Sequence, residues 1–498
     1  MATATKTFKN FIGGEWVDAA SGETFETTSP ATGEVLGVFP KSSAADVDRA
    51  VDAAKAAYEE WRLVPAPRRG EILFRFGALL AERKDEVAEL MAREMGKVLP
   101  EAAGDVQEAI DMSYYMGGEG RRLHGQTTPS ELRDKFNMSV RQPIGVVGVI
   151  TPWNFPIAIP SWKIAPALVC GNTIVFKPAT DTPLLGERFV ELLVEAGVPA
   201  GVINVVHGGG GEVGDRLVRH PDVPVITLTG SRETGVAVLE SAAPNLKHVH
   251  LELGGKNAII VLDDADLELA VEGIVWSAFG TSGQRCTAAS RVIVQEGAYE
   301  ELQKRLVAAA EKLRLGPGWE EGVDVGPVIN RRALEKIHSY TEIGVDEGAK
   351  LLTGGEVASG NGLGEGSFYR PTIFGDVDPQ MRVAQEEIFG PTTALIRVKD
   401  VDEAIRVSNG IEFGLSSSIF TRDVNTAFRA MRDLEAGITY INAGTIGAEV
   451  HLPFGGVKGT GNGHREAGQA ALDVFTEWKS IYVDYSGKLQ RAQIDTGE

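Results

Sequence analysis

Between residues 144 and 262 the sequence alternates regularly between short apolar runs and helical stretches. Helical patterns at 184–196 and 233–242 separate apolar runs at 145–150, 173–176, 202–206, 224–228 and 249–253. Short, continuously apolar strands between helices are typical of a parallel sheet that helices cover on both faces. The alternation therefore predicts a doubly wound nucleotide-binding architecture, whose ligands bind at the carboxyl ends of the strands.

Other parts of the chain predict further elements. Helices are expected from Ser43, which forms a capping box with Asp46, and over residues 69–95. A second α/β pattern runs from about 257 to 440, with strands near 258–261, 292–294 and 393–396. The segments 136–140 and 481–485 instead alternate strictly between apolar and polar residues. They form either a projecting sheet that pairs with another subunit or an ordinary edge hairpin.

Size and charge restrict the classes of function. A chain of 498 residues exceeds a single typical core, so we expect two or more domains. The formal net charge of −20 argues against nucleic-acid or anionic-membrane partners. Two cysteines without a CxxC pair, and no HExxH pattern, argue for a reducing compartment and against a metal site. With no signal-peptide core and no run of 18 apolar residues, we expect a cytoplasmic protein.

Cys286 lies in a turn of small and polar residues that follows a predicted helix at 266–279. The small residues leave room around the sulfur, and Arg285 is a neighbouring cation that favours the thiolate, so the sequence predicts a nucleophile. The alternative is a buried cysteine that acts as a small hydrophobe. That description fits Cys170, which lies in an apolar segment.

Two strand-to-helix junctions are candidate phosphate sites. Gly209, Gly211 and Gly214 match the GxGxxG pattern, whose glycines let backbone amides approach a pyrophosphate. The second junction, at 229–235, opens another helix, whose first N–H groups lack partners. Together they indicate a dinucleotide site, although each alone is compatible with a plain turn.

Two further polar residues follow predicted strands. Glu252 stands at the carboxyl edge of the sheet, where it is a candidate general base, or else a salt-bridge partner of a nearby lysine. Asn154 is a candidate oxyanion donor, or else a turn residue between two prolines.

The combination of motifs resembles the aldehyde dehydrogenase superfamily over essentially the whole chain. The motifs are, in chain order, Pro-Trp-Asn-Phe-Pro at 152–156, Phe-Lys-Pro at 176–178, Leu-Glu-Leu-Gly-Gly-Lys at 251–256, Gly-Gln-Arg-Cys at 283–286, Glu-Glu-Ile-Phe-Gly-Pro at 386–391 and Pro-Phe-Gly-Gly-Val-Lys at 453–458. The resemblance implies an α/β fold with a Rossmann-like NAD(P)-binding domain (1–123 and 144–254), an α/β catalytic domain (255–455) and a small β oligomerisation arm (124–143 and 471–498). A homodimer or homotetramer is then expected.

The resemblance also implies residue roles. Cys286 would be the nucleophile, Glu252 the base that activates water, and Asn154 an oxyanion donor together with the Cys286 backbone N–H. Lys163 and Glu466 match positions that assist proton transfer in some members. The implied cofactor positions are Trp153, Lys177, Thr180, Gly210, Gly214, Gly230, Ser231, Gly235, Leu253, Glu387 and Phe389. Strongly NAD-selective members often carry a glutamate where this chain has Thr180, so the cofactor is NAD or NADP.

The expected reaction is oxidation of an aldehyde to an acid through a thiohemiacetal and a thioester on Cys286, with hydride transfer to NAD(P)+ and hydrolysis assisted by Glu252. The motifs at 283–286 and 446–449 resemble members that act on 2-oxoglutarate or aminoadipate semialdehyde. Arg285 would hold the far carboxylate, or else only pair with an acidic neighbour. Phe155, Trp162 and Phe454 would line the aldehyde tunnel. The alternatives are a broad-specificity aldehyde dehydrogenase, a CoA-acylating enzyme, a non-redox thiol esterase and a non-catalytic protein.

Overall fold

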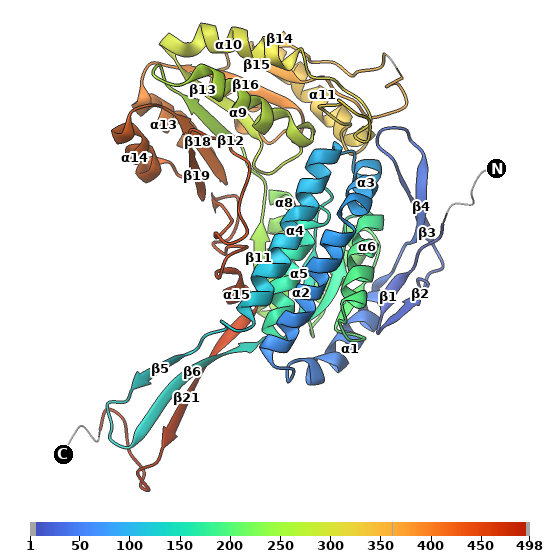
Figure 1. Cartoon of the computed structure of the whole chain (residues 1–498), viewed down its shortest axis with the longest axis vertical. Helices are drawn as coiled ribbons and strands as arrows, with labels where there is room; N and C mark the ends of the chain where they lie inside the picture. The colour runs from blue at the N-terminus through green and yellow to red at the C-terminus, as the bar shows by residue number, and fades with distance from the viewer. Residues whose placement is uncertain (1–5, 361, 495–498) are drawn as a thin grey trace.

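The computed structural model describes residues 6–360 and 362–494, which form two large sheets with helices on both faces and a projecting arm (Figure 1). This arrangement confirms the predicted α/β class. No helix in these two ranges is both long enough and apolar enough to cross a membrane.

The first sheet has the strand order β11-β10-β7-β8-β9-β1-β2, and the five strands from β7 to β11 are parallel. Each of the five apolar runs predicted between 145 and 253 forms one of these parallel strands. The strands are β1 (Asn10–Ile12), β2 (Glu15–Val17), β7 (Val146–Ile150), β8 (Thr173–Lys177), β9 (Ile203–Val205), β10 (Val225–Thr229) and β11 (His248–Glu252).

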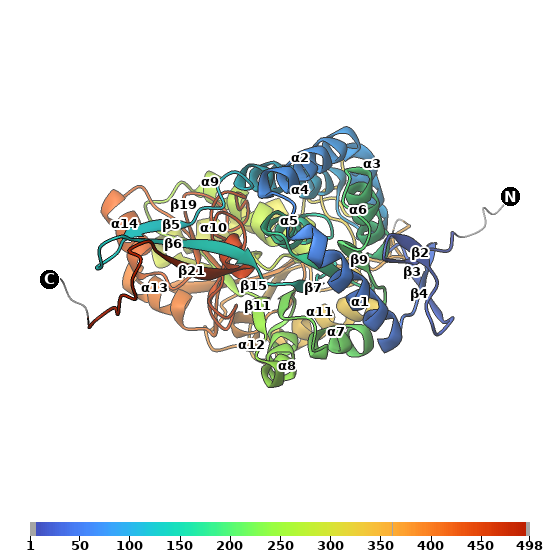
Figure 2. The same ribbon diagram turned by 90° about the horizontal axis from the view of Figure 1, so that it is seen from below.

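Two apolar cores cover the faces of this sheet, as alternation along the strands requires. Val147 and Val149 pack against one set of helices, and Val146 packs against the other. The first set is α2 (Ala66–Glu82), α4 (Leu99–Glu119), α5 (Ala158–Cys170) and α6 (Pro183–Glu195); the second is α1 (Ala44–Trp61), α7 (Asp215–Arg219) and α8 (Arg232–Ala242). Figure 2 shows α2 and α4 on one side of the sheet and α1, α7 and α8 on the other.

The second sheet has the order β14-β15-β16-β13-β12-β18-β19, with only β14 antiparallel to its neighbour in the described part of the sheet. Its strands are β12 (Asn257–Val261), β13 (Ala289–Gln295), β14 (Lys350–Thr353), β15 (Thr372–Gly375), β16 (Thr392–Val398), β18 (Ser416–Phe420) and β19 (Ile438–Ile441). One face carries α9 (Leu267–Phe279) and α10 (Glu296–Ala310), and the other carries α11 (Arg331–Asp346), α13 (Val401–Asn409) and α14 (Val424–Asp433). The predicted helix before Cys286 is α9, capped by Asp266.

The two alternating segments pair with each other in the arm. Strand β21 (Thr476–Asp484) runs antiparallel to β6 (Lys135–Pro143), so that Ile481 lies opposite Met138, and β5 (Gln126–Pro129) completes a three-stranded sheet. This sheet projects from the body at the lower left of Figure 1. Smaller elements are the pair β3 (Thr24–Thr28) and β4 (Val35–Pro40), the pair β17 (Phe413–Gly414) and β20 (Val457–Lys458), α12 (Arg382–Gln385) and α15 (Ala471–Val474).

The single helix predicted over 69–95 is wrong. The chain leaves helical geometry at Arg83 (φ −109°, ψ 22°), and a separate helix α3 (Lys84–Glu94) packs against α4 and α6. Apolar periodicity continues across the break because both helices bury their faces in the same core, which is why the sequence does not reveal it.

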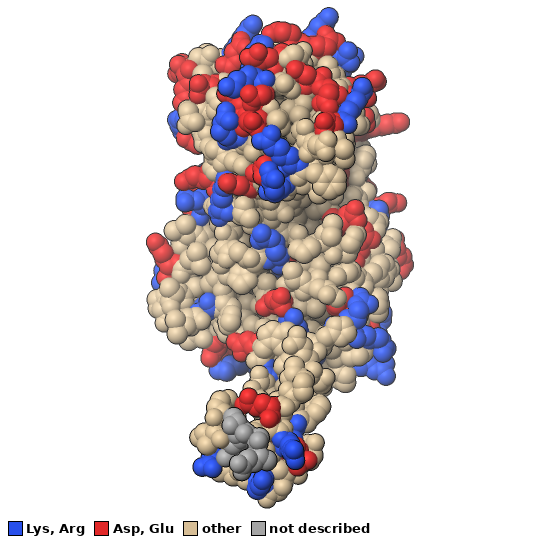
Figure 3. All heavy atoms as spheres, turned by 90° about the vertical axis from the view of Figure 1, so that its left-hand side faces the viewer, with Lys and Arg blue, Asp and Glu red and all other residues tan. Residues whose placement is uncertain are grey.

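Charges are mixed over the surface. Among the described residues on the face drawn in Figure 3, Lys and Arg are interspersed with Asp and Glu, so basic side chains do not gather into one patch there. This distribution agrees with the net charge of −20.

Candidate active site

A narrow cavity of about 60 Å3 lies where the first sheet ends against the second. Thr229, Glu252 and Leu253 enter it from the carboxyl ends of β10 and β11, while Arg285 and Cys286 enter from the loop after α9. A cavity at the carboxyl ends of parallel strands is the expected ligand position in such folds. The predicted nucleophile and base therefore face one space.

The loop that carries Cys286 has an unusual backbone held by buried partners. Thr281 and Ser282 have positive φ values of 53° and 56°, a conformation that non-glycine residues rarely adopt. The Glu101 carboxylate accepts hydrogen bonds from the Thr281 backbone N–H at 2.8 and 2.9 Å and from its hydroxyl at 3.1 Å. The Ser282 hydroxyl donates to the carbonyl of Gly326 at 2.7 Å. These bonds position the nucleophile.

Two asparagine amides fix the backbone on either side of the sulfur. The Asn154 amide donates to the carbonyl of Gln284 at 3.0 Å, and the Asn257 amide donates to the carbonyl of Cys286 at 2.7 Å. Asn154 is buried and directed toward the nucleophile loop. A side-chain N–H in this position can donate to an oxyanion that forms on a carbon bonded to the sulfur.

The expectation that Arg285 favours the Cys286 thiolate is wrong. Burial raises the pKa of the Cys286 thiol to about 12, and the carboxylates of Glu387, Glu252 and Glu466 add to that effect. The Arg285 guanidinium is instead directed toward Glu101, at 3.4 Å, and its Nε donates to the Thr281 hydroxyl at 2.9 Å. The resting sulfur is therefore a thiol, and a base must remove its proton.

Glu252 is suited to that kind of proton transfer. It is buried, and neither carboxylate oxygen has a hydrogen-bond partner among the described residues. Burial, with the nearby charge of Glu466, holds the pKa of Glu252 well above its usual range. A carboxyl with a raised pKa is a stronger base once ionised.

Lys163 and Glu466 lie beside this carboxyl. They form a buried ion pair, and the Lys163 ammonium also donates to the Thr227 hydroxyl at 3.0 Å. The structure thus brings together the positions that the sequence indicates for proton transfer, although they are 303 residues apart in the chain.

A second cavity, of about 480 Å3, lies next to the first sheet and is large enough for a dinucleotide half. Gly210, Gly211 and Gly214 line it together with Glu233 and Thr234 from the start of α8. A Cβ on Gly210 or Gly211 would meet nothing within 4 Å, so this wall is open to a ligand. The residues present fit a dinucleotide.

The two predicted phosphate junctions differ in the helix that follows. Gly210–Gly214 forms a π-helical turn before α7, which has only five residues, whereas Ser231 caps the 11-residue α8 by accepting from the Thr234 N–H. Gly235 packs so closely on Leu253 that a Cβ would lie 2.7 Å from its side chain. The second junction therefore offers the stronger helix N-terminus.

Three other predicted cofactor residues, Lys177, Thr180 and Glu387, do not line this second cavity. The Lys177 ammonium, at the end of β8, donates to the carbonyls of Pro178 and Gly208 at 2.9 and 3.1 Å, and burial lowers its pKa to about 8. Thr180 is exposed. The Glu387 carboxylate accepts from the Gly255 N–H at 2.9 Å.

An aromatic pair stands on the same side as Glu387. Phe389 has a positive φ of 62°, and its ring lies edge-on to Trp153, with centroids 5.5 Å apart. The loop that carries Glu387 and Phe389 belongs to the second sheet, and it thus lies against the carboxyl ends of the strands of the first sheet.

The outer part of the narrow cavity is aromatic. Phe155, Trp162 and Phe454 line it, and the rings of Trp162 and Phe454 are 5.1 Å apart and edge-on. Arg285 also lines it and stacks on Phe155, with its guanidinium carbon 5.3 Å from the ring centroid.

Helix α4 contributes acidic side chains to the site that the sequence did not reveal. Glu101, Asp105 and Glu108 lie on one face of this helix, and Glu108 lines the narrow cavity, where burial raises its pKa to about 7. The Lys97 ammonium pairs with Asp105 at 2.6 Å, with both side chains fully buried. Acidic residues at helical spacing among apolar ones were the available signal.

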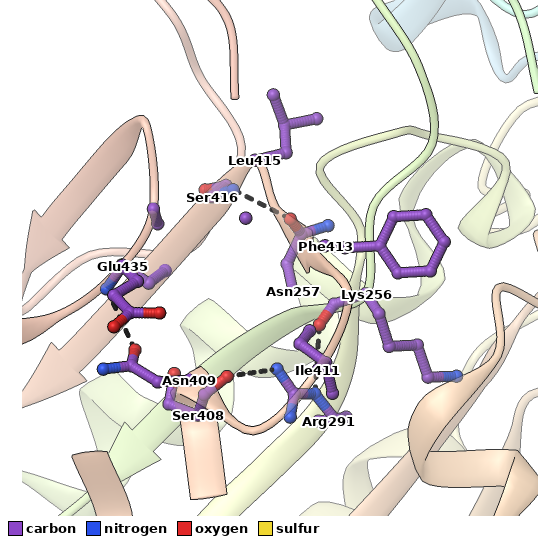
Figure 4. A pocket seen from close by; sticks show the side chains of 13 residues that line it. Lys256, Asn257, Arg291, Ser408, Asn409, Ile411, Phe413, Leu415, Ser416 and Glu435 are labelled. Atoms are coloured by element: carbon purple, nitrogen blue, oxygen red, sulfur yellow. Dashed lines mark hydrogen bonds between the residues drawn. The ribbon is translucent and has the colours of Figure 1, made fainter. Parts of the chain in front are cut away.

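A small crevice behind the nucleophile loop is structural (Figure 4). Arg291 fills its floor by donating to the carbonyls of Lys256, Val407 and Ser408 at 3.0 Å each, and Asn257 accepts from the Ser416 N–H at 2.9 Å. Its volume of about 10 Å3 is enough for one water molecule. The crevice therefore braces the segment that joins Glu252 to the second sheet.

A half-buried thiol, a buried carboxyl and a cavity large enough for half of a dinucleotide, on a doubly wound fold, define an oxidoreductase with a nucleophilic cysteine. The sequence pattern of the aldehyde dehydrogenase family matches residues 16–481. The chain therefore belongs to the aldehyde dehydrogenase family, whose members oxidise aldehydes with NAD(P), as the resemblance implied.

Individual relatives cover nearly the whole chain. Alpha-ketoglutaric semialdehyde dehydrogenase of Bacillus subtilis is 43% identical, over 97% of this chain and 99% of its own length. Alpha-ketoglutarate semialdehyde dehydrogenase of Haloferax volcanii is 45% identical, over 96% and 99%. The crystal structure of betaine aldehyde dehydrogenase from Staphylococcus aureus in complex with NAD+ superimposes with a TM-score of 0.94 at 35% identity, covering 97% of this chain and 95% of that one.

Proposed function

We propose that this protein oxidises a short, carboxylate-bearing aliphatic semialdehyde to the corresponding acid. The observation that supports this most directly is the single cavity that holds the Cys286 thiol, the Glu252 carboxyl and the Arg285 guanidinium. It provides a nucleophile, a base and a cation within one substrate-sized space.

In the first stage the Cys286 sulfur bonds to the aldehyde carbon as its proton passes to Glu252. The carbonyl oxygen becomes an oxyanion, which the Asn154 amide and the Cys286 N–H stabilise by hydrogen bonding. The bound nicotinamide supplies the acceptor for the hydride that leaves this carbon. For the cofactor itself, Lys177 would hold the adenosine ribose, Gly230 and Ser231 the pyrophosphate, and Glu387 the nicotinamide ribose.

Before the second stage Glu252 gives up the proton that it took from Cys286. The carboxylate then deprotonates a water molecule, which adds to the thioester and releases the acid. Glu252 is available to do so because both of its carboxylate oxygens lack hydrogen-bond partners among the described residues. The presence of this carboxyl argues against a CoA-acylating enzyme, which releases the thioester to a thiol instead. The cavity large enough for half of a dinucleotide argues against a thiol esterase or a non-catalytic protein.

For the substrate, Arg285 is the only lysine or arginine among the described residues that line the narrow cavity. Its pairing with Glu101 at 3.4 Å leaves room for a second, bidentate carboxylate partner. Glu108, with a pKa of about 7, adds a donor when protonated rather than a second negative charge. Two relatives named for alpha-ketoglutarate semialdehyde support 2-oxoglutarate semialdehyde as the substrate.

The aromatic walls formed by Phe155, Trp162 and Phe454 favour a second candidate, a broad-specificity dehydrogenase for aliphatic and aromatic aldehydes. Comparing kcat/KM for succinate, glutarate and 2-oxoglutarate semialdehydes with that for butanal and benzaldehyde separates the two. We expect a preference for the semialdehydes that Arg285→Ala abolishes, with butanal oxidation retained. Equal or better use of butanal by the parent enzyme would reject the carboxylate anchor.

For assembly, we propose that the arm joins subunits into a homodimer or homotetramer. Trp478 and Tyr482 on β21 are 51% and 67% exposed, which is unusual for large aromatic residues on a sheet. We also propose the domain division 1–123 with 144–254, 255–455, and 124–143 with 471–498. A monomer by light scattering at micromolar concentration would reject the assembly proposal.

A further inference from the structure

His250 lies two residues before Glu252 on β11, so both side chains project from the same face of the strand. Its ring is 2% exposed, and Nδ1 lies 3.0 Å from the Thr227 hydroxyl and 3.7 Å from Oε1 of Glu466. Nε2 lies 3.8 Å from Oε1 of Glu252 and has no hydrogen-bond partner among the described residues. Each of the two nitrogens of the buried imidazole thus faces a different carboxyl group.

The charged groups around the ring keep it neutral. Burial holds the pKa of His250 well below its usual range, and the cations Lys163 and Arg465, with His464, reinforce this effect. The carboxyls of Glu252 and Glu466 also face the ring, Glu252 at Nε2 and Glu466 at Nδ1. A neutral imidazole has one donor and one acceptor nitrogen, so it can accept a proton at one nitrogen while it gives one up at the other.

We propose that His250 transfers the deacylation proton from Glu252 to Glu466, an inference that rests on the proposed function. When water adds to the thioester, the new C–O bond forms as Glu252 takes one proton from the water. The C–S bond then breaks, its electron pair stays on the Cys286 sulfur, and the second proton of the water returns this sulfur to a thiol as the carboxylate product leaves. The Glu252 O–H then transfers its proton to Nε2 while Nδ1–H transfers its proton to Oε1 of Glu466. Glu252 returns to the carboxylate form, ready for the next water, and Glu466 carries the proton beside Lys163.

The distances permit this transfer after a small movement. Both nitrogen-to-oxygen distances exceed a hydrogen bond by less than 1 Å. The Glu252 carboxylate can close its gap because no partner restrains it. Hydrogen bonds of catalytic groups commonly shorten only when the substrate is bound.

His250→Gln tests the proposal because glutamine fills a similar volume but cannot transfer a proton. We expect a burst of about one NAD(P)H per site at the parental rate, followed by steady-state turnover reduced about tenfold or more. A small external base such as imidazole should raise this steady-state rate, because it can remove the proton from Glu252. The parent enzyme should show no such rescue.

His220→Gln is the matched control. His220 is also a buried histidine close to a carboxylate, 3.5 Å from Asp48, but it lies at the C-terminal end of α7 and does not line the narrow cavity. It should retain parental turnover. Glu466→Gln tests the other end of the transfer, and the double variant should turn over no more slowly than the slower single variant.

Three results would overturn the proposal: steady-state turnover of His250→Gln within twofold of the parent, equal losses in burst and steady-state rates without rescue, or additive losses in the double variant. If His250→Gln fails to fold, Glu466→Gln tests the proposal alone. Loss of the proton acceptor should leave the proton on Glu252, so this variant should show the same burst and the same rescue by imidazole; absence of either would overturn the proposal. An inactive parent enzyme would instead reject the proposed function.

Discussion

Replacing Glu252 by glutamine should separate the two stages of the reaction. The substitution keeps the size of the side chain and removes its ability to take a proton. Because the carboxyl is buried and has no partner among the described residues, losing its charge should not lower the melting temperature. Any effect on turnover therefore reflects chemistry rather than unfolding.

The expected magnitude follows from the two roles of the carboxyl. Loss of a general base typically slows a step about 10²- to 10⁴-fold, so hydrolysis of the thioester should slow by that factor. Formation of the thioester should slow less, because removing one of the carboxylates that raise the pKa of Cys286 makes its thiol easier to ionise. The ratio of the burst rate to the steady-state rate should rise at least about tenfold.

The assay is stopped-flow detection of NAD(P)H, with mass spectrometry to detect the acyl group on Cys286. In the parent enzyme, steady-state kcat should increase as the pH rises through the raised pKa of Glu252, because only the ionised carboxylate accepts a proton. That limb should disappear in Glu252→Gln. A normal steady-state rate in Glu252→Gln would refute the assignment of Glu252 as the deacylation base, because another residue would then have to activate the water.

The remaining predictions concern the nucleophile, the cofactor and the buried charges. Cys286→Ser should abolish oxidation while NAD(P)H still binds with nearly parental affinity in a fluorescence titration; substantial turnover would exclude Cys286 as the nucleophile. Thr180→Glu should weaken NADP binding at least about tenfold and leave NAD binding nearly unchanged, because the new carboxylate repels a 2′-phosphate; calorimetry with both cofactors checks this, and equal Kd changes would contradict it. Asp105→Ala should destabilise the protein by about 3–5 kcal/mol, since it leaves the Lys97 ammonium buried without its partner. A melting temperature equal to that of the parent would contradict this loss of stability. The exposed ion pair of Lys41 and Glu23 provides a control, because removing it should not change the melting temperature.

The sequence predicted the parallel strands well because a strand buried on both faces must be continuously apolar. It also placed α9 to within one residue, over 266–279 against the observed Leu267–Phe279, since the apolar face of a helix is a local feature. It did not reveal the break at Arg83, where two helices share one core. The sequence records apolar spacing, and this spacing is the same for one long helix and for two shorter helices that pack on one surface.

The candidate site was predicted where it depends on short motifs and missed where it depends on distant partners. Glu101 holds the nucleophile loop across 180 residues of sequence, and no local pattern links the two. Arg285 shows the same limit: adjacency in sequence suggested a contact with the sulfur, but the fold directs the guanidinium toward Glu101. Sequence neighbours on an irregular loop need not share a direction, so only the fold decides which charge acts on which group.

That charge arrangement bears on how the enzyme activates its nucleophile. A standing thiolate would need a cation beside Cys286, yet the charges that act on it most strongly are the carboxylates of Glu387, Glu252 and Glu466. These raise the pKa of the thiol, so the sulfur stays protonated and weakly reactive until a carboxylate takes its proton. Glu252 is suited to accept this proton, because its raised pKa makes the ionised carboxylate a stronger base than an ordinary carboxylate. Activation of Cys286 and activation of water then use the same carboxyl at different stages, and Glu252 must lose its proton between them.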